Sequence, residues 1–302
     1  MQNLFASLPL AAQMATDDYV GFTFFVGCMA MMAASAFFFL SMNGFDKKWR
    51  TSILVSGLIT FIAAVHYWYM RDYWADFGES PTFFRYVDWI LTVPLMCVEF
   101  YLILKAAGAK KSLMWRMIFF SVIMLVTGYI GEAVNRDMAQ IWGLISGLAY
   151  FAIVYDIWFG EAKKLAEAAG GAVLSAHKTL CWFVLVGWAI YPIGYMAGTP
   201  GWYDGIFGGL DLDIVYNIGD AVNKIGFGLV MGLAQLGINW SKLQWIIAAL
   251  GVGLGFGLQE IVANFISGII ILFERPIRVG DTVTIGNLSG TVRNIKIRDI
   301  TI

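Results

Sequence analysis

The sequence predicts an all-α membrane protein: a bundle of seven transmembrane helices, followed by a kinked helix and a short β-segment. Of its 302 residues, 59% are hydrophobic and only 14% are charged, with a mean hydropathy of +0.71, whereas a soluble domain carries about 25% charged residues. Seven apolar runs approach the roughly 20 residues that span a bilayer, at 21–42, 51–74, 83–106, 114–133, 139–159, 179–198 and 213–236. The connectors are short, so consecutive helices are expected to be antiparallel neighbours in the lipid bilayer.

Charge on the connectors predicts the orientation. Basic residues lie on alternate connectors, at Lys47, Lys48, Arg50, Lys110, Lys111, Lys163, Lys164 and Lys178. Acidic residues dominate the opposite ones, at Asp17, Asp18, Asp76, Glu79, Asp204 and Asp211. Because cytoplasmic loops are rich in Lys and Arg, the N-terminus is expected outside the cell (inner) membrane. The net charge of −1 indicates no nucleic-acid partner, and no cysteine spacing indicates a metal site.

The third run, FFRYVDWILTVPLMCVEFYLIL, carries charges at helical spacing. Arg85, Asp88, Thr92 and Glu99 are separated by three, four and seven residues, so they lie near one face of a helix. The rise from Asp88 to Glu99 is about 16 Å, which places one carboxylate in the outer half of the membrane and the other in the inner half. A structural salt bridge between Arg85 and Asp88 is the alternative interpretation, because intramembrane charges usually pair.

The seventh run places Lys224 at bilayer depth, where an ammonium is costly. Asp220 lies one turn earlier on the same face. The two residues could form a structural ion pair. Alternatively, the desolvated amine could act as a nucleophile and hold a ligand as a covalent imine.

Aromatic residues predict the walls of a slot for a flat, apolar ligand. Trp188, Tyr191 and Pro192 lie in the sixth run, and Trp89 lies in the third. The alternative is that they only fill the core. His66, in the second run, is either an ordinary hydrogen-bonded interior residue or a member of the functional site, and the sequence favours neither.

Two motifs, RYVDWILTVPL and VYNIGDAVNKIGFG, resemble the microbial rhodopsins of the proteorhodopsin and xanthorhodopsin group over residues 17–236. This resemblance implies that Lys224 carries all-trans retinal as a protonated Schiff base. It also implies that Asp88 and Asp220 are the counterions, with Asp88 the primary proton acceptor and Glu99 the cytoplasmic proton donor. The implied function is a light-driven outward proton pump.

The same resemblance assigns further residues. Arg85 gates release to the outside, His66 shares a hydrogen bond with Asp88, and Thr92 completes the pattern of the outward pumps. Met96 stands at the colour-tuning position, where an apolar residue implies green absorption. The alternative function is a photoreceptor that modulates an attached channel, and the donor carboxylate Glu99 favours the pump.

Gly143 in the fifth run is similar to a small residue of xanthorhodopsins that opens a window for a hydroxylated carotenoid antenna. A glycine also lets two membrane helices approach closely, which is the simpler interpretation.

Residues 237–302 resemble the pore helix and first β-strands of the small-conductance mechanosensitive channel family. Alternate glycines from Gly251 to Gly257 permit close helix packing, and Val252 and Phe256 match the pore constriction. DTVTIGNLSGTVRNIKI alternates like a strand, a turn and a strand. The predicted domains are an extracellular segment 1–17, a rhodopsin domain 18–236, a pore helix 237–273 and a truncated β-segment 274–302.

The two resemblances conflict in topology. Seven spans leave residue 237 inside, so one further span would place the β-segment outside, although the channel family keeps it inside. Either residues 244–273 lie at the interface or the orientation rule fails here. A homo-oligomer is expected, sevenfold by the channel resemblance and a trimer or pentamer by the pumps. A purely mechanosensitive channel leaves Lys224 and Asp88 unexplained.

Overall fold

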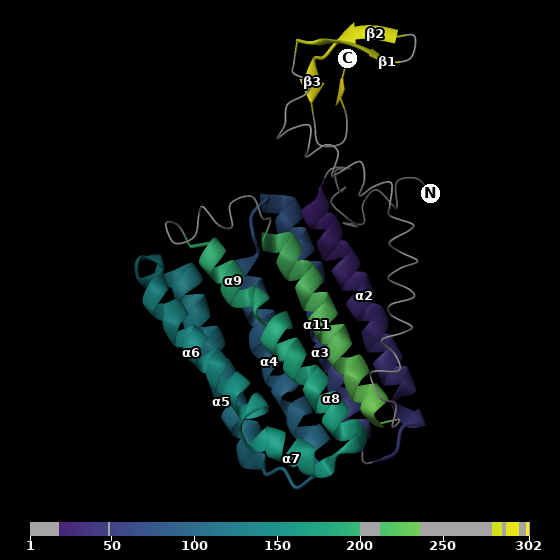
Figure 1. Cartoon of the computed structure of the whole chain (residues 1–302), viewed down its shortest axis with the longest axis vertical. Coiled ribbons are helices and arrows are strands. Elements are labelled where there is room, and N and C mark those ends of the chain that lie inside the picture. Colours follow the sequence, from purple (N-terminus) through teal and green to yellow (C-terminus); the bar gives the residue numbers. More distant parts are fainter. Residues whose placement is uncertain are drawn as a thin grey trace, which may run out of the picture. The chain divides into compact units, whose positions relative to one another are not determined.

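The computed structural model describes residues 18–47, 49–199, 212–235, 280–285, 288–295 and 300–301. The chain divides into two compact units, residues 1–240 and 241–302. The first unit is a bundle of long helices packed side by side (Figure 1). The predicted segment 1–17 and the predicted pore helix 237–273, with Val252, Phe256 and the disputed topology, lie outside the described residues.

All seven apolar runs form helices. The long helices and the segments between them are α2 (Tyr19–Ser41), α3 (Arg50–Phe77), α4 (Thr82–Lys105), α5 (Lys111–Tyr129), α6 (Ala139–Trp158), α7 (Glu161–Ala169), α8 (Gly171–Trp182), α9 (Ile190–Ala197) and α11 (Leu212–Gln235). Short helical turns are η1 (Met42–Gly44), η2 (Ile130–Val134), η3 (Arg136–Met138) and η4 (Phe183–Gly187). Within the described residues, six helical stretches are long and apolar enough to cross a membrane. The seventh helix, α11, is not among these six and carries Asp213, Asp220 and Lys224.

The sixth helix begins earlier than the predicted residue 179. It starts at Gly171, directly after the short helix α7, and the prediction was wrong because His177 and Lys178 lower the local hydropathy without stopping the helix. Gly170, with φ of 62°, makes the turn between α7 and α8 in a conformation that favours glycine. Farther along, the π-turn η4 joins α8 to α9, and its Trp188 N–H donates to the Phe183 carbonyl at 3.0 Å. Such turns frequently mark functional sites.

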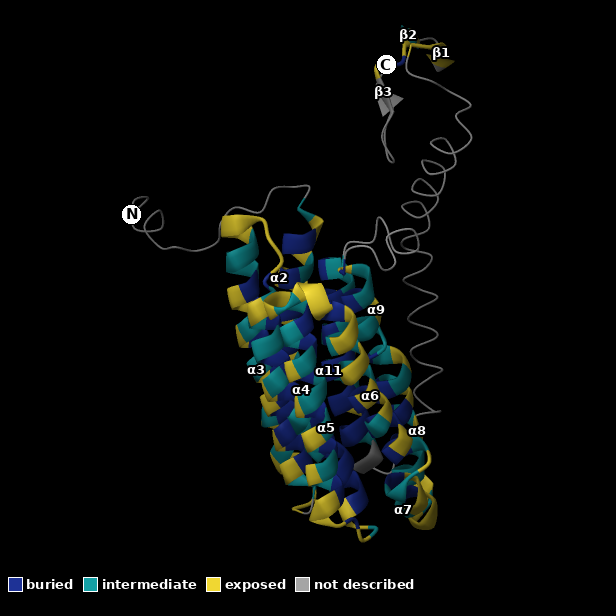
Figure 2. Cartoon of the chain, turned by 90° about the vertical axis from the view of Figure 1, so that its left-hand side faces the viewer, coloured by how far each residue is buried: buried dark blue, intermediate teal, exposed yellow. Residues whose placement is uncertain are grey.

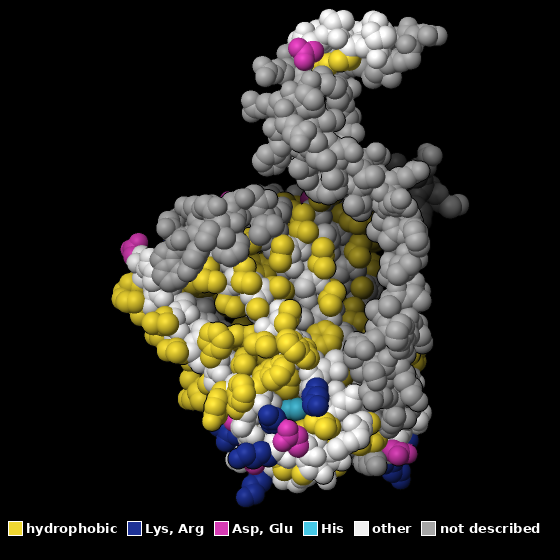
Figure 3. All heavy atoms as spheres, viewed as in Figure 1, with side chains coloured by type: hydrophobic (Ala, Val, Ile, Leu, Met, Phe, Trp, Pro, Cys, Tyr) yellow, Lys and Arg dark blue, Asp and Glu magenta, His cyan; other side chains and the backbone are white. Residues whose placement is uncertain are grey.

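The bundle is apolar outside and charged inside. Large apolar side chains such as Phe22, Leu40 and Trp115 are exposed on its outer surface. Figure 2 shows exposed positions, in yellow, along the helices of the bundle. Figure 3 shows hydrophobic side chains over the visible face of the bundle, with Lys and Arg gathered at the end where α7 lies. The interior instead buries Arg85 and Lys224 together with their acidic neighbours. This distribution suits a hydrocarbon environment, where charged residues face the bundle interior.

The second unit contains two short antiparallel pairs. β1 (Thr282–Ile285) pairs with β2 (Leu288–Thr291), so that Thr282 lies opposite Thr291. β3 (Asn294–Ile295) pairs with β4 (Ile300–Thr301). The first pair confirms the predicted strand, turn and strand.

Candidate functional site

Two stripes of polar residues face each other inside the bundle. The stripe on α11 follows helical spacing and consists of Asp213, Asn217, Asp220 and Lys224. The stripe on α4 consists of Arg85, Asp88, Trp89, Thr92 and Glu99. All of these side chains are buried. The spacing of three, four or seven residues brings each stripe to a single helix face.

Lys224 lies between two carboxylates. Its Nζ is 2.5 Å from Asp88 Oδ2 and 2.7 Å from Asp220 Oδ2. The lysine side chain is 2% exposed and neither carboxylate is exposed at all. A buried cation is tolerated only with such well-formed partners. The structure thus brings together the three residues that the sequence singled out.

The two carboxylates differ in how they are held. Asp220 accepts hydrogen bonds from Tyr191 Oη at 2.5 Å, Tyr67 Oη at 3.1 Å and Trp89 Nε1 at 3.2 Å. Among the described residues, the carboxylate of Asp88 has Lys224 as its one hydrogen-bond partner, and its Oδ1 has none. Asp220 is therefore fixed in place, whereas Asp88 keeps a free lone pair.

The predicted hydrogen bond between His66 and Asp88 does not form. His66 Nδ1 is 4.0 Å from Asp88 Oδ1, beyond hydrogen-bond distance. The reason is local, because Nδ1 lies 2.9 Å from the Ile62 carbonyl one turn earlier and donates to it. Thr92 behaves similarly, since its hydroxyl donates to the backbone carbonyl of Asp88 at 2.9 Å and not to the carboxylate.

Arg85 pairs with α11 and not with Asp88. Its Nη2 is 2.5 Å from Asp213 Oδ1, and its Nη1 donates to Asn217 Oδ1 at 3.1 Å. Its guanidinium also lies over the ring of Tyr216, 5.1 Å from the centroid. A salt bridge between Arg85 and Asp88 was therefore the wrong alternative. Sequence reasoning missed Asp213 and Asn217, although both follow the spacing of Asp220 and Lys224.

Glu99 lies toward the other end of α4 and has one described hydrogen-bond partner. Its Oε1 accepts from the hydroxyl of Ser56 on α3, while Oε2 has no partner among the described residues. Its side chain is fully buried. Ser56 was not predicted, because a serine in an apolar run gives no distinct sequence signal.

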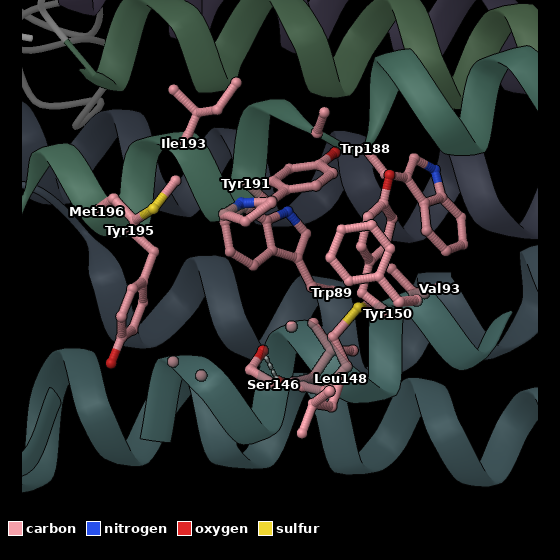
Figure 4. A pocket seen from close by; sticks show the side chains of 18 of the residues that line it. Trp89, Val93, Ser146, Leu148, Tyr150, Trp188, Tyr191, Ile193, Tyr195 and Met196 are labelled. Atoms are coloured by element: carbon pink, nitrogen blue, oxygen red, sulfur yellow. Dashed lines mark hydrogen bonds between the residues drawn. The ribbon is translucent and has the colours of Figure 1, made fainter. Parts of the chain in front are cut away.

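A cavity of about 600 Å³ lies between α4, α5, α6 and α9. The predicted wall residues Trp89, Trp188, Tyr191 and Pro192 line it, and Figure 4 shows the first three of them at the pocket. Met96 is buried but is not among the lining residues, so the structure does not place it in this pocket. Trp89 and Tyr191 line the cavity and also donate hydrogen bonds to Asp220. The cavity therefore reaches the residues that surround Lys224.

Gly143 lies in the cavity wall, where the ring of Tyr195 takes the space of a side chain. A Cβ on Gly143 would be 2.6 Å from Tyr195 Cε1. This contact supports glycine as a close-packing residue. Beside it, Leu144, Leu148 and Phe151 line the cavity and are at least 60% exposed. The cavity therefore opens onto the outer surface of the bundle.

Sequence reasoning also missed Glu132, which ends the apolar run of α5 inside η2. It accepts a hydrogen bond from Tyr86 Oη at 2.7 Å. Tyr86 lines the cavity and packs edge to face on Trp89, with ring centroids 5.0 Å apart. The signal was a carboxylate within a membrane-length apolar run.

The chain is similar to rhodopsins along most of its length. Residues 18–238 match the family of bacteriorhodopsin-like proteins. Green-light absorbing proteorhodopsin of Gamma-proteobacterium EBAC31A08 is 44% identical over 218 residues, which cover 71% of this chain and 86% of that protein. The crystal structure of blue light-absorbing proteorhodopsin from Med12 matches with a TM-score of 0.61 and 40% identity, covering 72% of this chain and 98% of that one. Xanthorhodopsin, a light-driven ion pump with dual chromophore, matches with a TM-score of 0.62 and 28% identity, covering 72% and 92%.

The C-terminal part matches a second group of proteins. Residues 225–259 match transmembrane helices 2/3 of mechanosensitive ion channels, and residues 260–302 match their β-domain. The miniconductance mechanosensitive channel MscM of Escherichia coli (strain K12) is 59% identical over 97 residues, which are 30% of this chain but only 9% of that channel. The chain therefore spans less than a tenth of this relative.

These matches agree with the buried lysine between two carboxylates and with the aromatic cavity beside them. The chain belongs to the bacteriorhodopsin-like family, as a microbial rhodopsin that continues into a region similar to mechanosensitive channels.

Proposed function

We propose that this protein is a light-driven outward proton pump that holds all-trans retinal as an imine of Lys224. The observation that carries the proposal is the Lys224 amine, buried between Asp88 and Asp220 and next to a cavity lined by aromatic side chains. When bound, retinal supplies light absorption and an isomerisation that re-aims the proton on the Lys224 nitrogen. The rest of the function depends on how the side chains hold and move protons.

The residues present fit retinal. The cavity of about 600 Å³ is within the range of about 300–1,000 Å³ common for small-molecule sites. Its lining is almost entirely apolar, as a polyene requires, and Trp89 and Tyr191 connect it to Asp220. Asp88 and Asp220 would neutralise a cationic nitrogen on Lys224.

The hydrogen bonds support Asp88 as the proton acceptor. The oxygens of Asp220 already accept hydrogen bonds from two tyrosines and a tryptophan. Asp88 Oδ1 has room to take a proton, since no described donor occupies it. Glu99 then serves as the donor, about 16 Å along α4 from Asp88, fully buried and with Ser56 as its one described hydrogen-bond partner.

The direction of transport follows from the ends of the bundle. Arg85 lies near the start of α4 and contacts Asp213 at the start of α11. Glu99 lies toward the other end of α4, which leads to the basic connector with Lys110 and Lys111. Because basic loops stay in the cytoplasm, protons would leave past Arg85 to the outside. We accordingly place the chain in the cell (inner) membrane with the N-terminus outside. The similarity to mechanosensitive channels supports a homo-oligomer.

Light-driven acidification by cells that make the protein and receive retinal tests this function. Lys224→Ala is expected to remove both the visible absorption band and the acidification. Asp88→Asn is expected to keep a coloured, shifted band but to stop transport. Asp76→Asn, a change of an exposed acid, is the control and should pump normally. Normal acidification by Asp88→Asn would overturn the assignment.

A second candidate function is light control of an ion channel. It is favoured by the position of the channel match, which begins at residue 225, directly after Lys224 and within α11. The last turns of α11 thus match both families. Electrical recording from reconstituted full chain would show a light-dependent ion current larger than the pump current. A proton current alone, unchanged by membrane tension, would favour the pump.

A carotenoid antenna is a separate proposal that depends on the opening beside Gly143. The exposed rim at Leu144 and Leu148 supports it, whereas the contact of Gly143 with Tyr195 supports a packing role. Excitation spectra after addition of a hydroxylated carotenoid test it. Energy transfer to retinal would support an antenna, and its absence would leave retinal as the single chromophore.

A further inference from the structure

The outward end of the two stripes contains an ion pair whose acidic member, Asp213, has no role in the proposed function. Arg85 on α4 and Asp213 on α11 are joined at 2.5 Å, and both are buried. Ser80, in the exposed stretch before α4, donates its hydroxyl to the same Asp213 oxygen at 2.9 Å. A line of contacts therefore runs from the buried guanidinium to the surface.

We propose that Asp213 is a positioning residue that holds the Arg85 guanidinium away from Asp88 and so controls how readily Asp88 takes up a proton. The inference rests on the proposed function, because it concerns the same proton acceptor. It adds a residue that neither the motifs nor the comparisons single out.

The charge and shape of the guanidinium give the reason. It cannot lose its charge in a protein, and a buried cation requires an anionic partner. Both of its described hydrogen bonds point outward along α11, to Asp213 and Asn217. Without the Asp213 charge, the next carboxylates along these two helices are Asp220 and Asp88.

Other charged and titratable groups act on this pair. Arg85 interacts electrostatically with Tyr67 on α3 and with Asp213, Tyr216 and Asp220 on α11. Glu132 on η2 interacts with both Arg85 and Asp213. Asp88 itself is faced by His66, Lys224 and Asp220. Only Asp213 among these is hydrogen-bonded to both Arg85 and a residue of the exposed stretch.

The first experiment is a pH titration of the visible band of purified, retinal-loaded protein. Protonation of Asp88 removes a counterion of Lys224 and changes the colour. In Asp213→Asn, Arg85 turns toward Asp88 and stabilises its anion, so the colour change is expected about one pH unit lower. Asp213→Glu should restore the wild-type midpoint, and Glu79→Gln, a change of an exposed acid, should leave it unchanged.

A double-mutant cycle separates positioning from a simple loss of charge. If Asp213 acts through Arg85, then Asp213→Asn shifts the midpoint in the wild-type background and has little effect in Arg85→Gln. Equal shifts in both backgrounds would overturn the proposal. An unshifted midpoint in Asp213→Asn, or no rescue by Asp213→Glu, would also overturn it.

Thermal unfolding of the retinal-free protein gives a readout that needs no chromophore. Asp213→Asn should lower the melting temperature by several degrees, because it removes the hydrogen-bonded anionic partner of the buried Arg85, and Asp213→Glu should restore most of the loss. A protein that stays colourless with retinal would refute the pump, while unchanged melting in Asp213→Asn would refute the ion pair. Coloured, pumping variants without the pH shift would refute this inference alone.

Discussion

The outward and inward halves of the bundle bury charge in different ways. Outward of Lys224, Arg85 is held by Asp213 and Asn217, and Glu132 is held by Tyr86. Inward of Lys224, Glu99 has a single described partner, Ser56. The outward half thus offers connected polar groups that continue to the exposed Ser80, whereas Glu99 in the inward half has Ser56 as its single described hydrogen-bond partner. This asymmetry suits the proposed pump. Proton release needs connected polar groups that reach the outer surface, whereas proton uptake needs a buried acid that gives up its proton only to the Lys224 nitrogen.

The largest effect is expected in the inward half. Glu99→Gln removes its buried carboxylate and should slow recovery of the photocycle by about 100-fold, in line with the loss of a positioned acid. Flash photolysis measures the recovery. Ser56→Ala is the matched change, because it keeps the carboxylate and removes its hydrogen bond, and it should slow recovery by less than about 10-fold. Recovery of Glu99→Gln at the wild-type rate would show that the inward half holds another donor.

A smaller effect is expected in the outward half, because several hydrogen bonds hold its polar side chains and each variant removes only one of them. Tyr86→Phe removes the described hydrogen bond to Glu132 and leaves that carboxylate without the donor. The cost should be about 1–3 kcal/mol in the free energy of unfolding, measured by denaturation in detergent. Tyr69→Phe, which changes an exposed tyrosine of α3, is the control. Equal stability of the two variants would contradict the network.

A comparison at the cavity wall involves an effect no larger than that of Tyr86→Phe. Gly143→Ala places a Cβ 2.6 Å from Tyr195 and should cost about 1–3 kcal/mol, as overpacking does. Gly147→Ala, one turn later and also in the cavity wall, meets nothing within 4 Å. It should stabilise the helix by up to about 1 kcal/mol. Thermal bleaching compares the two variants, and the same sign for both would exclude the Tyr195 contact as the reason for Gly143.

Periodicity and hydropathy predicted the helices and the two charged stripes. Asp220 and Lys224 could be placed together because one turn of helix separates them, whereas the position of Asp88 beside Lys224 came from the resemblance of the motifs. The chromophore itself came from the resemblance of the motifs, since spacing alone allowed a plain ion pair.

Side-chain choices between competing partners could not be predicted. His66 donates to the Ile62 carbonyl of its own helix and not to Asp88, and Arg85 selects Asp213 and not Asp88. Both outcomes depend on distances of a few ångströms between helices. The start of α8 was missed because His177 and Lys178 weaken hydropathy but do not break a helix.

The side opening of the cavity at Leu144, Leu148 and Phe151 has a bearing on how the pigment is assembled. A polyene dissolves in the hydrocarbon of the membrane far better than in water, since each buried CH₂ contributes about 0.8 kcal/mol. Because the cavity opens toward the hydrocarbon, retinal would enter the protein from the membrane, and its binding would depend on the retinal concentration in the lipid. The folded helices would then bind retinal directly from the bilayer, and retinal would not have to cross the loops that face water.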